Sequence, residues 1–365
     1  MNRGTADLWG SAVLYSPRDT VSEGSAFGLG RSNIHALYRA LCLTRAAEER
    51  LELLRVQGHV AGDVHRSGGR EAGAVGAAYA LRRKGDGTGD FLAPTAHAAG
   101  ALFLFGGELV DFFRQCMARE TGPTKGKDAN ANGFDRQTGF VGAVSSPGTM
   151  LEVMAGVTLS FRLRGEERVG VVFCGPGASS TGAWHEGLCF AAAQECPLIL
   201  VVENSHWAYA KQTRKNTRVS SLTEMAAGYG VGARSVDGTD VLAVFDAVRR
   251  AAALARAGGG TQMVELRYLW AEHDSWDGVD PALIAEWEEK DSIQLFRARL
   301  LTNEWASEHE LVAIEEEEFE RSRLAAERAI GEPGPYGPDA VENVYSDVPV
   351  SHPWARADVP DPALA

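Results

Sequence analysis

Cysteine is scarce in this sequence of 365 residues, and the five cysteines follow no repeated spacing. A fold stabilised by disulfides or by a structural metal ion would carry cysteines in regularly spaced pairs. We therefore expect reduced thiols that pack as small hydrophobic side chains. The five are Cys42, Cys116, Cys174, Cys189 and Cys196.

Long apolar runs and an excess of positive charge are also missing. No uninterrupted apolar run approaches the roughly 20 residues of a membrane-spanning helix, and the segment 1–16 lacks the basic start and apolar stretch of a signal peptide. The 36 Lys and Arg residues against 49 Asp and Glu residues give a net charge of −13. Such a surface repels phosphate backbones and anionic lipids. We expect a cytoplasmic protein with no nucleic-acid or membrane partner.

The remaining composition is that of a globular protein, with 45% hydrophobic and 23% charged residues. The length allows two domains or a single large α/β domain. We divide the chain into an N-terminal arm at 1–33, an α/β domain with a helical C-terminal extension at 34–332, and a proline-rich extended tail at 333–365.

Apolar strands alternate with helical patterns along the chain. The runs 169–174 and 197–202 are continuously apolar, which is typical of parallel strands buried on both faces. Shorter strands are expected at 91–94 and 263–267. Helices are expected at 34–58, 71–83, 101–119, 182–196 and 241–257, and again beyond Asp280. This alternation predicts an α/β fold with a doubly wound, mainly parallel sheet.

Two segments have no regular period. The stretch 121–146 is dominated by Gly, Asn, Asp, Lys and Ser, and loops of that length are usually functional or disordered. The turn Gly175–Gly182 lies between a strand and a helix, where helix amides bind anions. Its glycines do not fit the G-x-G-x-x-G dinucleotide spacing, although Glu203 stands where a ribose-binding acid would. A tight turn without a ligand is the third interpretation.

The succession of segments after this turn resembles one family. The turn is followed by a helix, a buried strand and Glu203-Asn-Ser205, which is similar to the thiamine diphosphate motif in the E1 component alpha subunit of pyruvate and branched-chain 2-oxo acid dehydrogenases. The similarity runs from Ile34 to Pro333. Further segments match in the same order: Leu43–Arg45 with Glu48–Arg50, Gly69–Ala72 with Val75-Gly76, Gly126-Lys127, Phe140–Ala143, and Val236–Gly238 with Asp240-Val241.

The resemblance implies a thiamine diphosphate- and Mg²⁺-dependent enzyme that decarboxylates a 2-oxo acid and passes on an acyl or ketol group. It also implies a beta-type partner subunit in an α₂β₂ assembly, because this chain shows no beta-type half, and an acyl-carrier or lipoyl protein as a further partner. The cofactor would supply the electron sink, and the protein binding, orientation and proton transfer.

The resemblance also assigns site residues. His273 and His65 take the catalytic positions, with His273 in a segment, 273–277, similar to the family loop His-Ser-x-Ser-Asp. A purely structural histidine is the alternative at each position. The positions that would contact the cofactor are His97, Gly139, Val141, Gly142, Gly175, Gly177, Ala178, Ser205 and Trp207. Ser205 Oγ and the Trp207 carbonyl would be weak metal ligands.

The departures from the family pattern fall on the same site. Pro176 stands where the family has an Asp that ligates Mg²⁺, and Ser205 replaces a ligating Asn. Mg²⁺ requires nearly octahedral oxygen coordination, usually with a carboxylate, and proline has no side-chain oxygen. Ala96 and His97 replace a Tyr and an Arg that face the diphosphate. We expect a protonated His97 to restore part of the lost charge, with help from Lys125, Lys127 and Arg136.

Three functions therefore remain open at this level. The first is an alpha-type subunit of a thiamine diphosphate-dependent enzyme with an altered cofactor site. The second is a non-catalytic or thiamine diphosphate-independent relative that serves as a scaffold or regulator for a beta-type partner. The third, a nucleotide-binding oxidoreductase, rests only on Gly175 and Gly177.

Overall fold

A computed structural model of the chain describes residues 28–60, 64–128, 134–208, 211–212, 217–268 and 281–342. Its centre is a seven-stranded sheet with the order β2-β3-β1-β4-β5-β9-β8. All strand pairs are parallel except β2–β3, which confirms the predicted α/β class and its mainly parallel sheet. The strands are β1 (Phe91–Ala93), β2 (Phe134–Asp135), β3 (Phe140–Val141), β4 (Gly170–Cys174), β5 (Leu198–Asn204), β8 (Gly232–Asp237) and β9 (Gln262–Arg267). A separate ribbon pairs β6 (Trp207–Ala208) with β7 (Lys211–Gln212).

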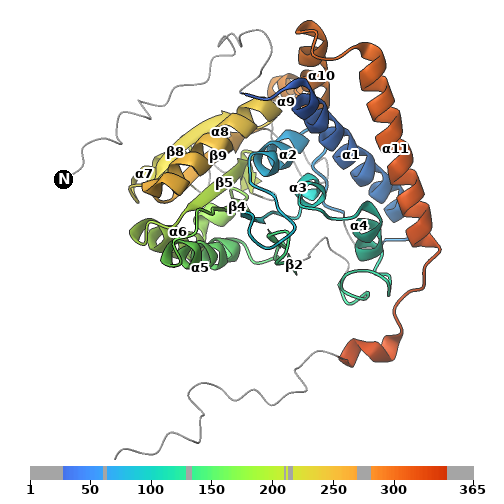
Figure 1. The fold of residues 1–365 in the computed structure, drawn as a ribbon, viewed down its shortest axis with the longest axis horizontal. Helices are drawn as coiled ribbons and strands as arrows, with labels where there is room; N and C mark the ends of the chain where they lie inside the picture. Colours follow the sequence, from blue (N-terminus) through green and yellow to red (C-terminus); the bar gives the residue numbers. More distant parts are fainter. Residues whose placement is uncertain are drawn as a thin grey trace, which may run out of the picture.

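The two central strands, β4 and β5, are buried along their whole length. Successive side chains of a strand point to opposite faces. Val171 and Val201 therefore join one apolar cluster, and Val172 and Leu200 join another. Helices α2 (Glu71–Tyr79) and α8 (Val241–Leu254) cover the first face, while α5 (Thr149–Leu163) and α6 (Gly182–Ala193) cover the second (Figure 1).

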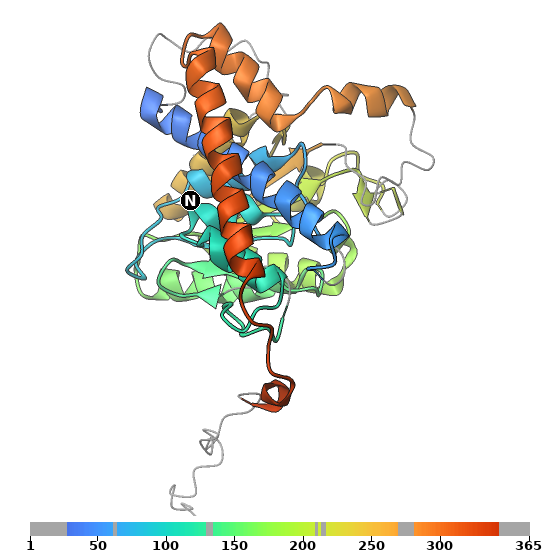
Figure 2. The ribbon, with the colours of Figure 1, turned by 90° about the vertical axis from the view of Figure 1, so that its right-hand side faces the viewer.

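An outer helical layer lies beyond α2. The long helices α1 (Arg31–Val56) and α11 (Glu308–Ile330) pack against each other along their lengths (Figure 2). The buried Ser322 hydroxyl of α11 donates to the Ala46 carbonyl of α1 at 2.9 Å, and this hydrogen bond fixes the relative position of the two helices. The remaining helices are α3 (Ala99–Leu104), α4 (Leu109–Cys116), α7 (Thr223–Ala227), α9 (Pro281–Glu288) and α10 (Ser292–Thr302). No helix among the described residues is both long and apolar enough to span a bilayer.

The structure differs from the predicted elements in three respects. The single helix expected at 101–119 is two helices, α3 and α4, because Gly106 has a positive φ of 90° and a Cβ at Gly107 would lie 2.5 Å from the Leu102 side chain. Helix α5 and strand β8 were not predicted at all. The long irregular stretch at 121–146 contains the short strands β2 and β3. Most of the predicted arm and tail lies outside the described residues.

Candidate functional site

The order of the strands changes direction at β1. After β1 the chain adds β2 and β3 on one side, and then adds β4 and β5 on the other. In open parallel sheets, ligands bind beyond the carboxyl ends of the strands at such a switch point. A cavity of about 440 Å³ lies there, and its wall includes 94–97 after β1, 173–176 at the end of β4, and Glu203 and Ser205 at the end of β5. We call it the switch-point cavity.

The structure brings several of the predicted site residues to this cavity. His65, His97, Gly175, Ala178 and Ser205 all line it. Pro176 lines it as well, so the two positions at which the chain departs from a magnesium site, 176 and 205, face the same space.

The other predicted site residues that the structure describes are not among the cavity lining. Gly139 has a φ of 83°, and a Cβ there would lie 2.3 Å from the Asp90 carbonyl oxygen, so packing against β1 explains this glycine. Val141 belongs to the apolar cluster beneath α5 and α6. Gly142 and Gly177 neighbour lining segments without lining the cavity themselves. His273 lies outside the described residues, as does the Trp207 side chain.

The two histidines of the cavity contact each other. Their rings meet edge to face, with centroids 5.0 Å apart. Burial, followed by the charges of Arg70 and His65, lowers the pKa of His97 well below its usual value. The expectation of a protonated His97 is therefore wrong, because a buried imidazole beside a guanidinium loses its proton more readily. Lys125, Lys127 and Arg136 are also absent from the described lining.

Hydrogen bonds hold side chains in the cavity wall and beside it. The Thr95 hydroxyl donates to Glu203 Oε2 at 2.6 Å. Burial, and next the Glu203 carboxylate, raise the pKa of the Tyr268 phenol well above its usual value. Arg70 Nη1 donates to the Tyr268 hydroxyl at 3.2 Å, and the guanidinium carbon lies 5.2 Å from the centre of that ring.

Sequence reasoning missed most of these contacts. It gave Glu203 only the role of a possible ribose-binding acid, and it assigned no role to Thr95, Tyr268 or the Arg70 side chain. Three of these four residues, Thr95, Glu203 and Tyr268, lie within two positions of the last residue of a strand of the sheet. Position at the carboxyl end of a parallel strand was therefore a signal that could have identified them.

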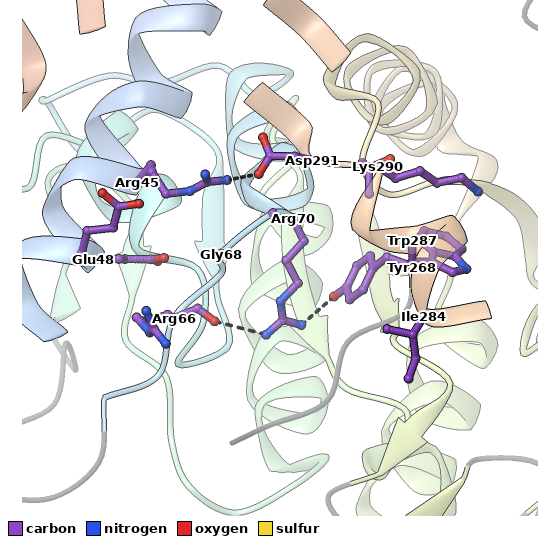
Figure 3. A pocket seen from close by; sticks show the side chains of 13 residues that line it. Arg45, Glu48, Arg66, Gly68, Arg70, Tyr268, Ile284, Trp287, Lys290 and Asp291 are labelled. Carbon is purple, nitrogen blue, oxygen red and sulfur yellow. Dashed lines mark hydrogen bonds and ion pairs between the residues drawn. The ribbon is translucent and has the colours of Figure 1, made fainter. Parts of the chain in front are cut away.

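A second pocket, of about 310 Å³, also has Arg70 in its wall (Figure 3). Its wall combines Arg45 and Glu48 of α1, the loop 66–70, and Trp287 of α9. We call it the outer pocket. Arg70 lines both this pocket and the switch-point cavity, so its side chain stands at their junction.

The loop between the two pockets is held by buried carboxylates. Glu48 accepts hydrogen bonds from the Ser67 backbone N–H at 2.7 Å and from its hydroxyl at 2.9 Å. Burial and the neighbouring Glu71 raise the pKa of Glu48 to about 8. Arg45 pairs with Glu71 and, at 2.7 Å, with Asp291, the residue that caps α10. These contacts fix the position of the segment that carries His65 and Arg70.

The described residues of the switch-point cavity do not fit a magnesium–diphosphate group. Position 176 offers no side-chain oxygen, His97 is neutral, and Ser205 supplies only a hydroxyl, which is a poor substitute for a carboxylate ligand. Among the residues that the structure describes, no cluster of three or more His, Cys, Asp or Glu side chains could hold a metal ion. A polyanion placed here would have little charge to balance it.

Comparison with known proteins identifies related chains. The family model described as "Dehydrogenase E1 component" matches residues 38–335. The chain is 29% identical to the alpha subunit of acetoin:2,6-dichlorophenolindophenol oxidoreductase from Cupriavidus necator, over 88% of this chain and 97% of that protein. It is 31% identical to the 2-oxoisovalerate dehydrogenase alpha subunit of Bacillus subtilis, over 69% of this chain and 76% of that protein. It is 28% identical to the pyruvate dehydrogenase E1 alpha subunit of the same organism, over 92% of this chain and 88% of that protein.

Proposed function

The chain belongs to the dehydrogenase E1 component family as an E1 alpha-like subunit of the 2-oxo acid dehydrogenase type, and on that premise we propose that it is the alpha-type subunit of a heteromeric enzyme acting on a 2-oxo acid. The reaction would be decarboxylation followed by transfer of an acyl or ketol group. The partner would be a beta-type subunit in an α₂β₂ assembly, and the acceptor a lipoyl or other acyl-carrier protein.

One observation carries this proposal: the cavity at the switch point is lined by segments at which the sequence resembles the family's site. His65, Gly175 and Ser205 come from three separate parts of the sequence and line one space. A cavity of about 440 Å³ has the size of a small-molecule site. The relatives carry names of two 2-oxo acid dehydrogenases and an acetoin oxidoreductase, which narrows the substrate to small oxo acids and their close chemical neighbours.

The E1 alpha relatives imply dependence on thiamine diphosphate at the level of the family. In this chain the residues at the corresponding positions do not suit magnesium–diphosphate binding, so we derive no step through that group. The role we propose for the chain is to hold the substrate anion, to present the His65 imidazole to it, and to assemble with the beta-type partner.

A second candidate is favoured by the same substitutions. With Pro176 at the metal position and a neutral His97, the chain would serve as a scaffold or regulator of a beta-type subunit and bind no thiamine diphosphate. The two candidates share the fold and the partner and differ in the coenzyme.

Calorimetric titration separates them. The chain is purified together with its beta-type partner and titrated with thiamine diphosphate at millimolar Mg²⁺, and CO₂ release from pyruvate and 2-oxoisovalerate is measured on the same sample. CO₂ release supports the enzyme, and saturable binding would show in addition that the coenzyme is retained. A stable complex that shows neither result contradicts the enzyme and supports the scaffold.

A further inference from the structure

Arg70 is a buried cation that faces a cavity. The residue has only 7% of its surface exposed, and it lines both the switch-point cavity and the outer pocket, the second of which is shown in Figure 3. Its Nη1 donates to the Tyr268 hydroxyl at 3.2 Å, and its Nη2 donates to the Arg66 carbonyl at 3.4 Å. Its own backbone N–H donates to the Ser67 carbonyl at 2.8 Å. The guanidinium is therefore held in place at both ends of the residue.

The charges around the switch-point cavity are few. Among the described residues that line it, Arg70 is the only arginine or lysine, and Glu203 is the only acidic residue. The Glu203 carboxylate accepts the Thr95 hydroxyl at 2.6 Å. Burial, and next the charges of Arg70 and His65, lower the pKa of the His97 imidazole well below its usual value, which disfavours a positive charge there. This charge set suits a ligand with a single negative charge placed at the guanidinium, and it opposes a diphosphate with several.

The rest of the wall divides into a polar and an apolar part. Ser145, Ser146 and Ser205 offer hydroxyls, which can donate to an oxo or hydroxyl oxygen. Met150, Leu151 and Phe173 form an apolar part that can accept a short carbon chain. A carboxylate next to an oxo group on a short apolar chain matches both parts.

We propose that the switch-point cavity binds a 2-oxo acid directly and without a metal ion, with the substrate carboxylate on the Arg70 guanidinium. Arginine presents two parallel N–H donors that match the two oxygens of a carboxylate, a geometry that lysine cannot reproduce. Arg70 is then the residue that determines specificity for monocarboxylates. This inference rests on the proposed function, which supplies the substrate class.

The test is a binding measurement that needs no turnover. The complex of the full-length chain with its beta-type partner is titrated with 2-oxoisovalerate and with pyruvate, in the absence of Mg²⁺ and coenzyme. We expect saturable binding of at least one acid, weakened about tenfold or more in Arg70→Gln because a charge-assisted hydrogen bond is lost. The affinity of Arg70→Lys should lie between those of the parent and Arg70→Gln, since lysine keeps the positive charge and lacks the two parallel N–H donors. Arg70→Lys also serves as the folded variant should Arg70→Gln fail to fold.

A control variant and a competition experiment complete the test. Lys290→Gln removes a cation that lines only the outer pocket, and binding should stay within about twofold of the parent, because this variant keeps every charge-assisted contact assigned to the ligand. Inorganic pyrophosphate with Mg²⁺ should not compete. Failure of both acids to bind, unchanged binding in Arg70→Gln and Arg70→Lys, or tight competition by magnesium pyrophosphate would each overturn the inference. A complex that binds the acid through Arg70 but releases no CO₂ would instead contradict the proposed function alone.

Discussion

Pro176 and Ser205 are the two residues at which the cavity differs most from a magnesium site. Both line the same space, so oxygens added at these positions would enter one cavity. We predict that Pro176→Asp combined with Ser205→Asn strengthens the affinity of the complex for Mg²⁺ with thiamine diphosphate by about tenfold or more, since a carboxylate is the ligand that Mg²⁺ most often uses. Calorimetric titration of parent and variant checks this.

The matched control for this pair adds the same groups elsewhere in the cavity. Ser146→Asn with Pro147→Asp changes two other lining residues and should leave the affinity unchanged. Equal affinities in the parent and in the first variant would contradict the placement of the metal positions at 176 and 205.

Glu48 gives the fold a pH dependence that the sequence does not suggest. Its pKa of about 8 in the folded chain lies above the ordinary carboxyl value, so the folded state keeps a proton that the unfolded chain releases. The contribution of Glu48 to the free energy of unfolding is therefore present at low pH, and it is lost as the pH rises toward 8. In Glu48→Gln the fall in the free energy of unfolding between pH 6 and pH 8.5 should be smaller by about 1–2 kcal/mol.

Urea denaturation at the two pH values measures this difference. Glu49 is the neighbouring residue and is exposed, so Glu49→Gln should keep the pH dependence of the parent. A parent-like dependence in Glu48→Gln would show that Glu48 titrates normally despite its burial.

At the scale of elements, close helix packing holds the sheet beside the site. Helix α2 begins directly after Arg70 and packs against α8. A Cβ at Gly76 of α2 would lie 2.8 Å from the Val241 carbonyl oxygen and 3.0 Å from the Val244 side chain. Only glycine allows the two helices to approach this closely.

We therefore predict that Gly76→Ala destabilises the chain by about 1–3 kcal/mol, the usual cost of overpacking a close-packed interior. Gly156 of α5 provides the matched comparison, because a Cβ there meets nothing within 4 Å. Gly156→Ala should stabilise the chain by about 0.5–1 kcal/mol through helix propensity. Denaturant unfolding of both variants measures the change in the free energy of unfolding. Similar changes in the two variants would disprove the packing argument.

At the scale of the whole molecule, catalysis and assembly are separable. His273 is the catalytic position implied by the family resemblance, and it lies outside the described residues. We predict that His273→Ala abolishes acyl transfer by the complex and leaves its assembly with the beta-type partner intact. Size-exclusion chromatography and a turnover assay on the same preparation measure the two properties.

The comparison variant for that experiment is His309→Ala, which changes an exposed histidine on α11. It should assemble and turn over like the parent. Full activity in His273→Ala would make that residue structural, and loss of assembly would place it at the subunit interface.

The elements that the sequence alone identified are those whose pattern is local. Strands β4 and β5 were predicted because a continuous apolar run is the mark of a strand buried on both faces. Strand β8 was missed because it lies at the edge of the sheet and is mostly half-buried, with Arg234 and Ser235 among its residues. Helix α5 was missed because it starts after Gly148, which provides no side-chain cap.

The sequence by itself determined the α/β class, the order of the segments and the family, since apolar periodicity and motif order are written along the chain. Only the tertiary structure decided that Pro176 and Ser205 share one cavity, that His97 is neutral, and that Arg70 stands between two pockets. The reason is that a pKa and a local charge balance depend on burial and on neighbours that folding brings from distant positions. The spacing of residues along the chain therefore predicts neither the pKa nor the local charge balance.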